Sequence, residues 1–204
     1  LNGNRLMTSL IIIVSTLVIY SLFWCWYVGF GRKVSPELIE QVMLHCTKAG
    51  GVWSSATHQR NVRKLLENDD GKEFVMVNLL AIKSPKRESL KLLKQYTDIF
   101  LRSLLKRGGH PIAQARALSG KIEFLNVPAE EEWHSAFLVR YRSRRDFALM
   151  ALETAGSEHH DFKMAGLDRT IAFPAAPWFA MGGPKLMVAL ILALATALLH
   201  LLLM

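Results

Sequence analysis

The chain has 204 residues, of which 51% are hydrophobic and 21% are charged, and its formal net charge is +8 at pH 7. All 17 acidic residues lie between Gly31 and Gly183, as do all 25 basic residues except Arg5 and Lys185. This partition of charge excludes an ordinary soluble globule, a disordered tail protein and a transporter with many spans. It leaves one charged segment of ordinary domain size between two hydrophobic ends.

The first hydrophobic end predicts a transmembrane helix over residues 6–30. No charge interrupts Leu6–Phe30. A helix of that length measures roughly 37 Å, which is more than the thickness of a hydrocarbon core. A secretory signal peptide is the alternative, but its apolar run is shorter, and no small-residue cleavage motif follows Phe30.

The second hydrophobic end predicts another transmembrane helix, over residues 185–204. Leu186–Met204 is uncharged and apolar on every face, which favours contact with lipid over burial in a soluble core. A removed lipid-anchor tail is the weaker alternative, because no polar spacer precedes Leu186. Small residues for close helix packing recur along the segment: Ala189, Ala193, Ala195 and Ala197.

Basic and aromatic residues near the two spans predict an orientation. Two spans place both termini on one side of the membrane and the domain on the other. Arg32, Lys33 and Lys185 on the domain side outnumber Arg5, so the positive-inside rule predicts a cytoplasmic domain. We expect an aromatic belt at the domain-side interface, formed by Trp24, Trp26, Tyr27, Trp178 and Phe179.

His200 is an ionisable residue inside the second span. Such residues are candidates for function by default. His200 is therefore a candidate contact for a partner helix and a candidate ligand for a pigment or haem. The alternative is a side chain that reaches the interface, because His200 lies close to the end of the span.

Residues 31–70 predict a helical linker segment. Ser35-Pro36-Glu37 has the composition of a helix start, and Gly50-Gly51 ends that helix after Lys48. A second helix is expected over residues 58–67, followed by a turn at Asn68-Asp69-Asp70-Gly71.

Residues 71–175 predict an α+β domain. The patterns indicate strands over 74–82, 110–118 (with an extension to Phe124 as the alternative), 133–141 and 170–173, the last ended by Pro174. Helices are expected over 89–107, 143–155 and 157–166. The order β-α-β-β-α-β is that of a ferredoxin-like domain, an antiparallel sheet with helices on one face. The other face needs a cover, and a second copy of the sheet is the simplest one.

Several motifs in this domain resemble a known family. They are Phe74–Lys83 (FVMVNLLAIK), Tyr96, Gly108-Gly109, the strand end Leu138–Ser143 and the helix with His159-His160. Over residues 57–174 the chain resembles domain-of-unknown-function family 1330, of the dimeric α/β barrel superfamily. The resemblance implies that two ferredoxin-like sheets pair into a barrel, and it implies no established reaction. Cofactor-independent oxygenases and haem-binding enzymes occur in the wider superfamily, which is an analogy of fold alone.

The chain departs from the family pattern at two points. Arg142 stands where a proline is usual, and hydrophobic spans flank the domain, whereas typical members are small and soluble.

Polar residues on the predicted strands and helices are candidates for a ligand site. Asn78 interrupts an apolar strand and either projects its amide into a cavity between sheet and helices or is buried and hydrogen-bonds to the backbone of a neighbouring loop. The arginines from Arg116 to Arg145 either bind a carboxylate or phosphate, form a solvated face, or pair with Glu130–Glu132. The candidate ligand-binding residues are Asn78, Tyr96, Arg116, Arg140 and Tyr141.

No catalytic, metal or cofactor motif stands out. His159-His160-Asp161 lacks chelating spacing, His58, His110 and His134 are scattered, and Cys25 and Cys46 do not form a disulfide framework. We expect no metal, no cofactor and no catalytic residue. The interleaving of acidic with basic residues also argues against nucleic acid as a partner.

Two functions remain open. The first is a non-catalytic accessory or assembly subunit of a larger integral membrane complex, with other membrane subunits, the lipid bilayer and a homodimer through the sheet face as its contacts. The alternative is a membrane-tethered enzyme or sensor that binds a small lipophilic or aromatic molecule in the barrel cavity.

Overall fold

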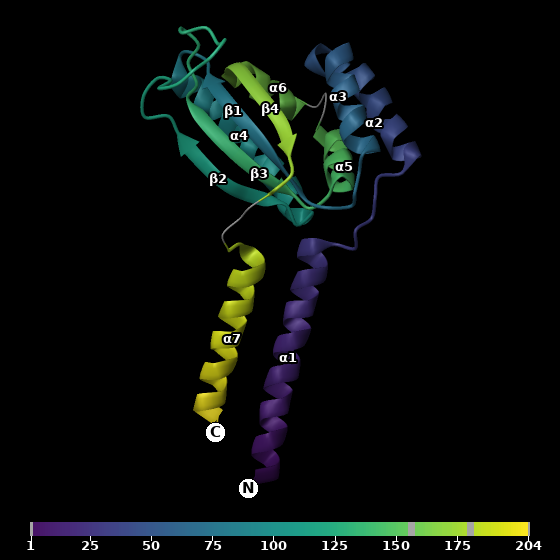
Figure 1. Cartoon of the computed structure of the whole chain (residues 1–204), viewed down its shortest axis with the longest axis vertical. Coiled ribbons are helices and arrows are strands. Elements are labelled where there is room, and N and C mark those ends of the chain that lie inside the picture. Colours follow the sequence, from purple (N-terminus) through teal and green to yellow (C-terminus); the bar gives the residue numbers. More distant parts are fainter. Residues whose placement is uncertain (1, 155–157, 179–181, 204) are drawn as a thin grey trace. The chain divides into compact units, whose positions relative to one another are not determined.

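The computed structural model describes residues 2–154, 158–178 and 182–203 (Figure 1). The chain divides into two compact units. One contains the two terminal segments, up to Phe30 and from Trp178, and the other runs from Gly31 to Pro177. The boundary at Gly31 directly precedes Arg32, the first charged residue after Arg5.

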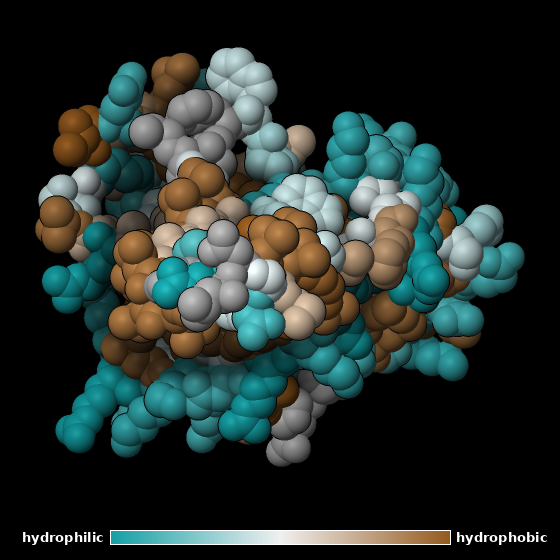
Figure 2. Space-filling view, turned by 90° about the horizontal axis from the view of Figure 1, so that it is seen from below, coloured by the Kyte–Doolittle hydropathy of each residue, from teal (hydrophilic) through white to brown (hydrophobic). Residues whose placement is uncertain are grey.

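The terminal unit consists of two apolar helices, α1 (Asn2–Val28) and α7 (Pro184–Leu203). Both are long and apolar enough to cross a membrane, and their apolar side chains are exposed (Figure 2). The prediction of two such helices is confirmed. α1 ends at Val28 because Gly29 adopts a positive φ of 74°, which favours glycine at the end of a helix.

Three helical elements open the second unit: α2 (Pro36–Ala49), the short 3₁₀ helix η1 (Gly51–Ser54) and α3 (Ala56–Glu67). Ser35 caps α2 by accepting a hydrogen bond from the Leu38 amide, and Ser55 caps α3 in the same way. Residues of α2 and α3 surround Ala148 in a buried cluster around Val42, Cys46 and Leu66. The two helices expected in residues 31–70 are present, and this segment belongs to the same compact unit as the sheet.

The sheet has four strands in the order β2-β3-β1-β4, and every neighbouring pair is antiparallel. The strands are β1 (Phe74–Ile82), β2 (His110–Arg116), β3 (Ser135–Tyr141) and β4 (Leu167–Ala175). α4 (Lys86–Lys106) connects β1 to β2, whereas α5 (Arg144–Thr154) and α6 (Glu158–Gly166) lie between β3 and β4 in the sequence. The predicted α+β class with an antiparallel sheet is confirmed.

Three strands differ from their predicted bounds, and β3 starts at Ser135 and not at Trp133. β4 starts at Leu167 and continues through Pro174, which pairs with Met76. Proline is tolerated there because β4 is an edge strand. β2 ends at Arg116, so the predicted continuation to Leu118 or Phe124 is wrong. Residues 117–134 instead form a long connection between β2 and β3.

The two faces of the sheet have different surroundings. Phe74 and Tyr141 are directly paired, and their rings stack at 5.0 Å in a buried cluster with Leu104 of α4 and Met150 of α5. This is the face that the helices cover, and α4 lies behind the sheet in Figure 1. Side chains at alternate positions project from the opposite face, which we call the open face.

Candidate functional site

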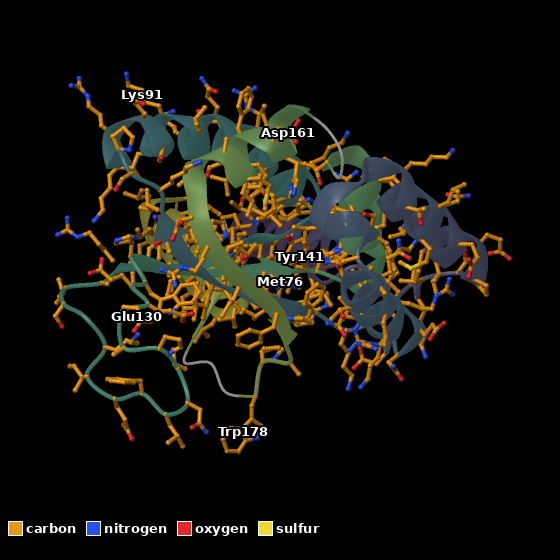
Figure 3. The ribbon with its side chains drawn as sticks, turned by 90° about the horizontal axis from the view of Figure 1, so that it is seen from above. Met76, Lys91, Glu130, Tyr141, Asp161 and Trp178 are labelled. Carbon is orange, nitrogen blue, oxygen red and sulfur yellow. The ribbon has the colours of Figure 1, made fainter. Side chains whose placement is uncertain are left out.

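Three predicted site residues lie on the helix-covered side of the sheet. Asn78 of β1 pairs with Phe137 of β3, and Phe74 pairs with Tyr141. The two pairs are four residues apart on each strand, so all four side chains project from the same face of the sheet. Figure 3 shows Met76 and Tyr141 in the interior of the domain. Tyr96 reaches this region from α4, where its ring stacks on that of Phe100 at 5.5 Å.

The amide of Asn78 is held by backbone. Its Nδ2 donates to the carbonyl oxygens of Met76 and Phe137, both at 3.1 Å. Of the two predicted arrangements, the structure has the one in which a half-buried amide bonds to neighbouring backbone. The backbone belongs to the strands and not to a loop. Asn78 therefore stabilises the β1–β3 pair.

Burial governs the chemistry of the two tyrosines. It raises the pKa of the Tyr96 phenol, and it raises the pKa of the Tyr141 phenol together with a smaller electrostatic effect of Tyr96. Both hydroxyls are therefore neutral near pH 7. They can donate or accept a hydrogen bond, but they cannot supply a phenolate.

The two predicted arginines lie away from this group. Arg140 pairs with Val75, so it belongs to the open face, where it is buried. Its guanidinium bonds to Glu73, at 2.6 Å from Nε, and to the carbonyl oxygen of Gly108, also at 2.6 Å. Arg116 is exposed at the end of β2. The structure thus brings together Asn78, Tyr96 and Tyr141, and it separates Arg116 and Arg140 from them.

The arginines near β3 form internal ion pairs. Arg142 donates two hydrogen bonds to the Asp146 carboxylate of α5, from Nε at 2.7 Å and from Nη2 at 2.9 Å. Arg144 contacts Asp69 at 3.8 Å and Asp70 at 3.5 Å, which ties the start of α5 to the turn after α3. These two arginines therefore pair with aspartates and not with Glu130–Glu132.

The middle of the open face is apolar, between the ends that carry Arg140 and Arg169. Val77 and Leu79 of β1 pair with Leu138 and Ala136 of β3, and on the other side with Phe173 and Ile171 of β4. Ile171 and Phe173 are 47% and 48% exposed. Exposed aliphatic and aromatic side chains on neighbouring strands are typical of a surface that another protein covers.

The β2–β3 connection adds apolar side chains to the surface. Leu118, Ile122 and Leu125 are 93%, 95% and 83% exposed. Hydrogen bonds within the connection hold its two halves together: Lys121 Nζ donates to the carbonyl oxygens of Pro128 and Glu131, both at 2.6 Å. An ordered segment that presents aliphatic side chains to water is typical of a contact surface.

A basic cluster lies outside the predicted site residues. The Trp53 ring of η1 meets the ring of His58 of α3 at 4.7 Å and that of His160 of α6 at 5.1 Å, both edge to face. Further along α6, Lys163 Nζ lies 5.6 Å from the centre of the Tyr96 ring. No local pattern signals this cluster, because Trp53 and His160 are far apart along the chain and match no motif. Among the described residues, no group of three or more histidine, cysteine or acidic side chains is arranged to hold a metal.

The predicted partner-helix contact of His200 is made within the chain. His200 Nε2 lies 3.1 Å from Ser9 Oγ of α1. Thr16 and Thr196 are hydrogen-bonded at 2.6 Å, and the Tyr20 hydroxyl donates to the carbonyl oxygen of Lys185 at 3.2 Å. Polar contacts therefore follow the seam between α1 and α7.

The predicted interface residues cluster in part. Lys185 Nζ lies 5.7 Å from the ring centre of Trp24 and 5.9 Å from that of Tyr27. Trp26 is 46% exposed and Trp178 is 99% exposed. Phe179 lies outside the described residues.

Comparisons with known proteins reveal distant structural likeness. No family model matches the chain, and no curated protein matches it. A crystal structure of a protein of unknown function from Rhodopseudomonas palustris is 18% identical, covers 62% of this chain and 95% of that one, and has a TM-score of 0.45. The methylated form of the same protein is 17% identical over 66% of this chain and 99% of that one, with a TM-score of 0.48.

Proposed function

We propose that the chain is a non-catalytic accessory or assembly subunit of a larger integral membrane complex, and that its domain associates through the open face. In this proposal the domain is ferredoxin-like, of the dimeric α/β barrel type, and related to family 1330. The two terminal helices anchor it, the domain is cytoplasmic, and both termini lie across the membrane.

The apolar open face is the observation that carries the proposal. Helices cover only one side of the sheet, and on the other side Ile171 and Phe173 remain about half exposed beside Val77 and Leu79. Burial of apolar surface contributes about 25 cal/mol per Å², so a partner that covers this face gains free energy. The strand order β2-β3-β1-β4 and the element order β1-α4-β2-β3-α5-α6-β4, with one helix more than the simple pattern, support the ferredoxin-like assignment.

A second copy of the domain is the simplest partner for this face. Two antiparallel sheets pack face to face at about 10 Å and bury each other's apolar side chains. The exposed Leu118, Ile122 and Leu125 of the β2–β3 connection provide a further surface for other subunits. The polar contacts between α1 and α7 support a paired anchor over two independent spans.

Lysine substitutions on the open face test the proposal. The variant Ile171→Lys/Phe173→Lys places two charges on that face. The matched control Leu90→Lys/Leu105→Lys changes two α4 side chains of similar exposure, 51% and 47%. Full-length protein, extracted in a mild detergent, is analysed by light scattering and by identification of co-purifying chains.

We expect the open-face variant to lose the dimer or its stoichiometric partners, and the control to keep them. An open-face variant that keeps the wild-type assembly would contradict the proposal. A wild-type protein that purifies as a lone chain with a bound lipophilic molecule would favour the alternative, a membrane-tethered enzyme or sensor.

A further inference from the structure

His134 joins the β2–β3 connection to the end of the sheet. It directly precedes β3, where the pairing of β1 with β3 ends at Leu80 and Ser135. Its backbone amide donates to the carbonyl oxygen of Leu80 at 2.8 Å, and its carbonyl oxygen accepts from the Ala117 amide at 2.9 Å. Ala117 is the first residue of the connection and His134 is the last, so contacts of one residue hold both ends of the segment.

The imidazole of His134 takes the place of a backbone acceptor. Its Nδ1 accepts a hydrogen bond from the backbone amide of Ile82 at 2.8 Å. In a continued antiparallel ladder, a carbonyl oxygen of the neighbouring strand would accept from this amide. The ring therefore ends the β1–β3 ladder, and the chain turns away from the sheet without leaving the Ile82 amide unbonded.

This contact fixes the protonation state of the ring. A backbone N–H can only donate, so Nδ1 must be unprotonated and the ring proton must lie on Nε2. Nε2 is buried and has no hydrogen-bond partner in the described part of the chain, and Oε2 of Glu132 lies 3.6 Å away. Only the neutral imidazole of His134 can make the contact with Ile82.

Charged groups from several segments lie around His134. The Glu132 carboxylate of the connection favours a protonated ring, whereas Arg169, which lies opposite Ala81 on β4, disfavours it. Arg169 is itself paired with Glu131 at 3.5 Å, which reduces its effect. The other charged groups at this end of the sheet are Arg116 at the end of β2, Lys83 after β1 and Asp168 of β4. These charges set the pH at which the ring takes up a proton, and the geometry decides what protonation does.

We propose that His134 is a proton-sensitive latch, and that protonation of its Nδ1 breaks the bond to Ile82 and releases the β2–β3 connection from the sheet. A proton on Nδ1 places two N–H groups against each other across 2.8 Å, where they repel. The charged ring turns out of the contact toward Glu132 and water. The Glu132 carboxylate offsets part of the lost bond, so the opening is local and the rest of the sheet stays folded.

The latch controls an apolar surface. The connection presents Leu118, Ile122 and Leu125 to solvent, and these side chains keep one arrangement only while the segment is attached to the sheet. The latch lies within a single chain and does not depend on association through the open face. Each of the two proposals therefore stands or fails without the other.

The variant His134→Asn keeps the acceptor and removes the titration. Asparagine Oδ1 lies close to the position of histidine Nδ1 and accepts a hydrogen bond at every pH, because an amide does not titrate. His134→Leu removes the acceptor and keeps a side chain of similar size. The matched control is His45→Asn, which removes a histidine from α2, outside both the connection and the sheet.

Full-length protein in detergent micelles is compared at pH 8 and pH 5, which span the range in which histidine normally changes charge. NMR follows hydrogen exchange of the Ile82 amide, corrected for the intrinsic dependence of exchange on pH. A spin label on Ser119→Cys reports the mobility of the connection.

We expect acid to reduce the protection of the Ile82 amide about fivefold in the wild type, which corresponds to the loss of one net hydrogen bond, and to make the label more mobile. His45→Asn should respond like the wild type. His134→Asn should show neither change, and His134→Leu should have low protection and a mobile label at both pH values.

Three results would overturn the latch. One is a ¹⁵N signal of the His134 ring that places the proton on Nδ1 at pH 8. Another is corrected exchange of the Ile82 amide that does not change with pH in the wild type. The third is a response of His134→Asn to acid as large as that of the wild type.

Discussion

Gly109 decides how closely α4 approaches the sheet. A Cβ atom at this position would lie 2.5 Å from Leu104 Cδ1 and 2.8 Å from the backbone oxygen of Arg140. Leu104 belongs to the buried cluster and Arg140 to a paired strand, so neither neighbour can move without loss of packing. A side chain at 109 would therefore push the helix end away from β3.

We expect Gly109→Ala to lower the free energy of unfolding by about 1–3 kcal/mol, the usual cost of overpacking. Gly120→Ala is the matched control, because nothing lies within 4 Å of a Cβ there. Thermal unfolding of the full-length protein in detergent measures both. Equal melting temperatures for the two variants would show that the contact at Gly109 relaxes freely.

His160 makes stability depend on pH. Its pKa is about 4 in the folded protein, against 6.5 for an unperturbed histidine, and burial also lowers the pKa of His58. Between these values the unfolded chain binds protons that the folded chain does not, so stability is fully present above about pH 6.5 and is lost as pH falls toward 4. Carboxyl groups titrate mostly below this window.

We expect the free energy of unfolding to fall by about 1–2 kcal/mol from pH 7 to pH 4.5, after allowance for partial exposure. The variant His160→Gln should lose most of this slope, and His45→Gln on α2 should keep it. Unfolding curves at several pH values test the prediction, and an unchanged slope in His160→Gln would refute it.

Individual residues illustrate what local sequence can predict. The cap at Ser35 follows from residues that are adjacent in the chain, so the sequence was sufficient. The partners of Arg144 are Asp69 and Asp70, which the fold brings from a distant turn, and no local pattern specifies them. The same reason hid the contact between Trp53 and His160.

At the scale of elements, α1 and α7 form a pair through polar side chains. Ser9, Thr16 and Tyr20 follow one stripe of α1 and meet His200, Thr196 and the Lys185 carbonyl. In lipid the hydrophobic effect does not drive helices together, so hydrogen bonds and close packing hold such a pair.

A double-mutant cycle on Thr16→Val and Thr196→Val measures one of these bonds. We expect a coupling of about 0.6 kcal/mol, the average for interhelical hydrogen bonds in a membrane protein. Thr8→Val with Thr196→Val is the control cycle, because Thr8 donates to the Asn4 carbonyl of its own helix. Unfolding in mixed micelles provides the free energies. Equal coupling energies in the two cycles would contradict a stabilising hydrogen bond between Thr16 and Thr196.

The sequence predicts a strand best where the strand is one continuous run of apolar residues. β1 was predicted over its full length, because it is central and reads as one apolar run. β4 was predicted too short, because Pro174 is a breaker in a central strand and not at an edge. Edge position is a property of the whole sheet, and the sequence near Pro174 does not contain it.

At the scale of the whole molecule, the proposed orientation is testable with cysteine chemistry. Cys46 is fully buried and Cys25 lies within α1, so both should react poorly with a membrane-impermeant maleimide. Ser119→Cys places a thiol on the exposed β2–β3 connection. We expect labelling in inverted vesicles and not in intact cells, and the reverse result would contradict a cytoplasmic domain.

The short links between sheet and helices have a further consequence. Residues 29–35 and 176–183 connect the domain to α1 and α7, and each link reaches at most about 30 Å. For anchored copies, encounter is then confined to a thin layer beside the bilayer, where the effective concentration far exceeds that of the same protein in bulk solvent. If the proposed association of open faces holds, a modest intrinsic affinity would suffice under such confinement.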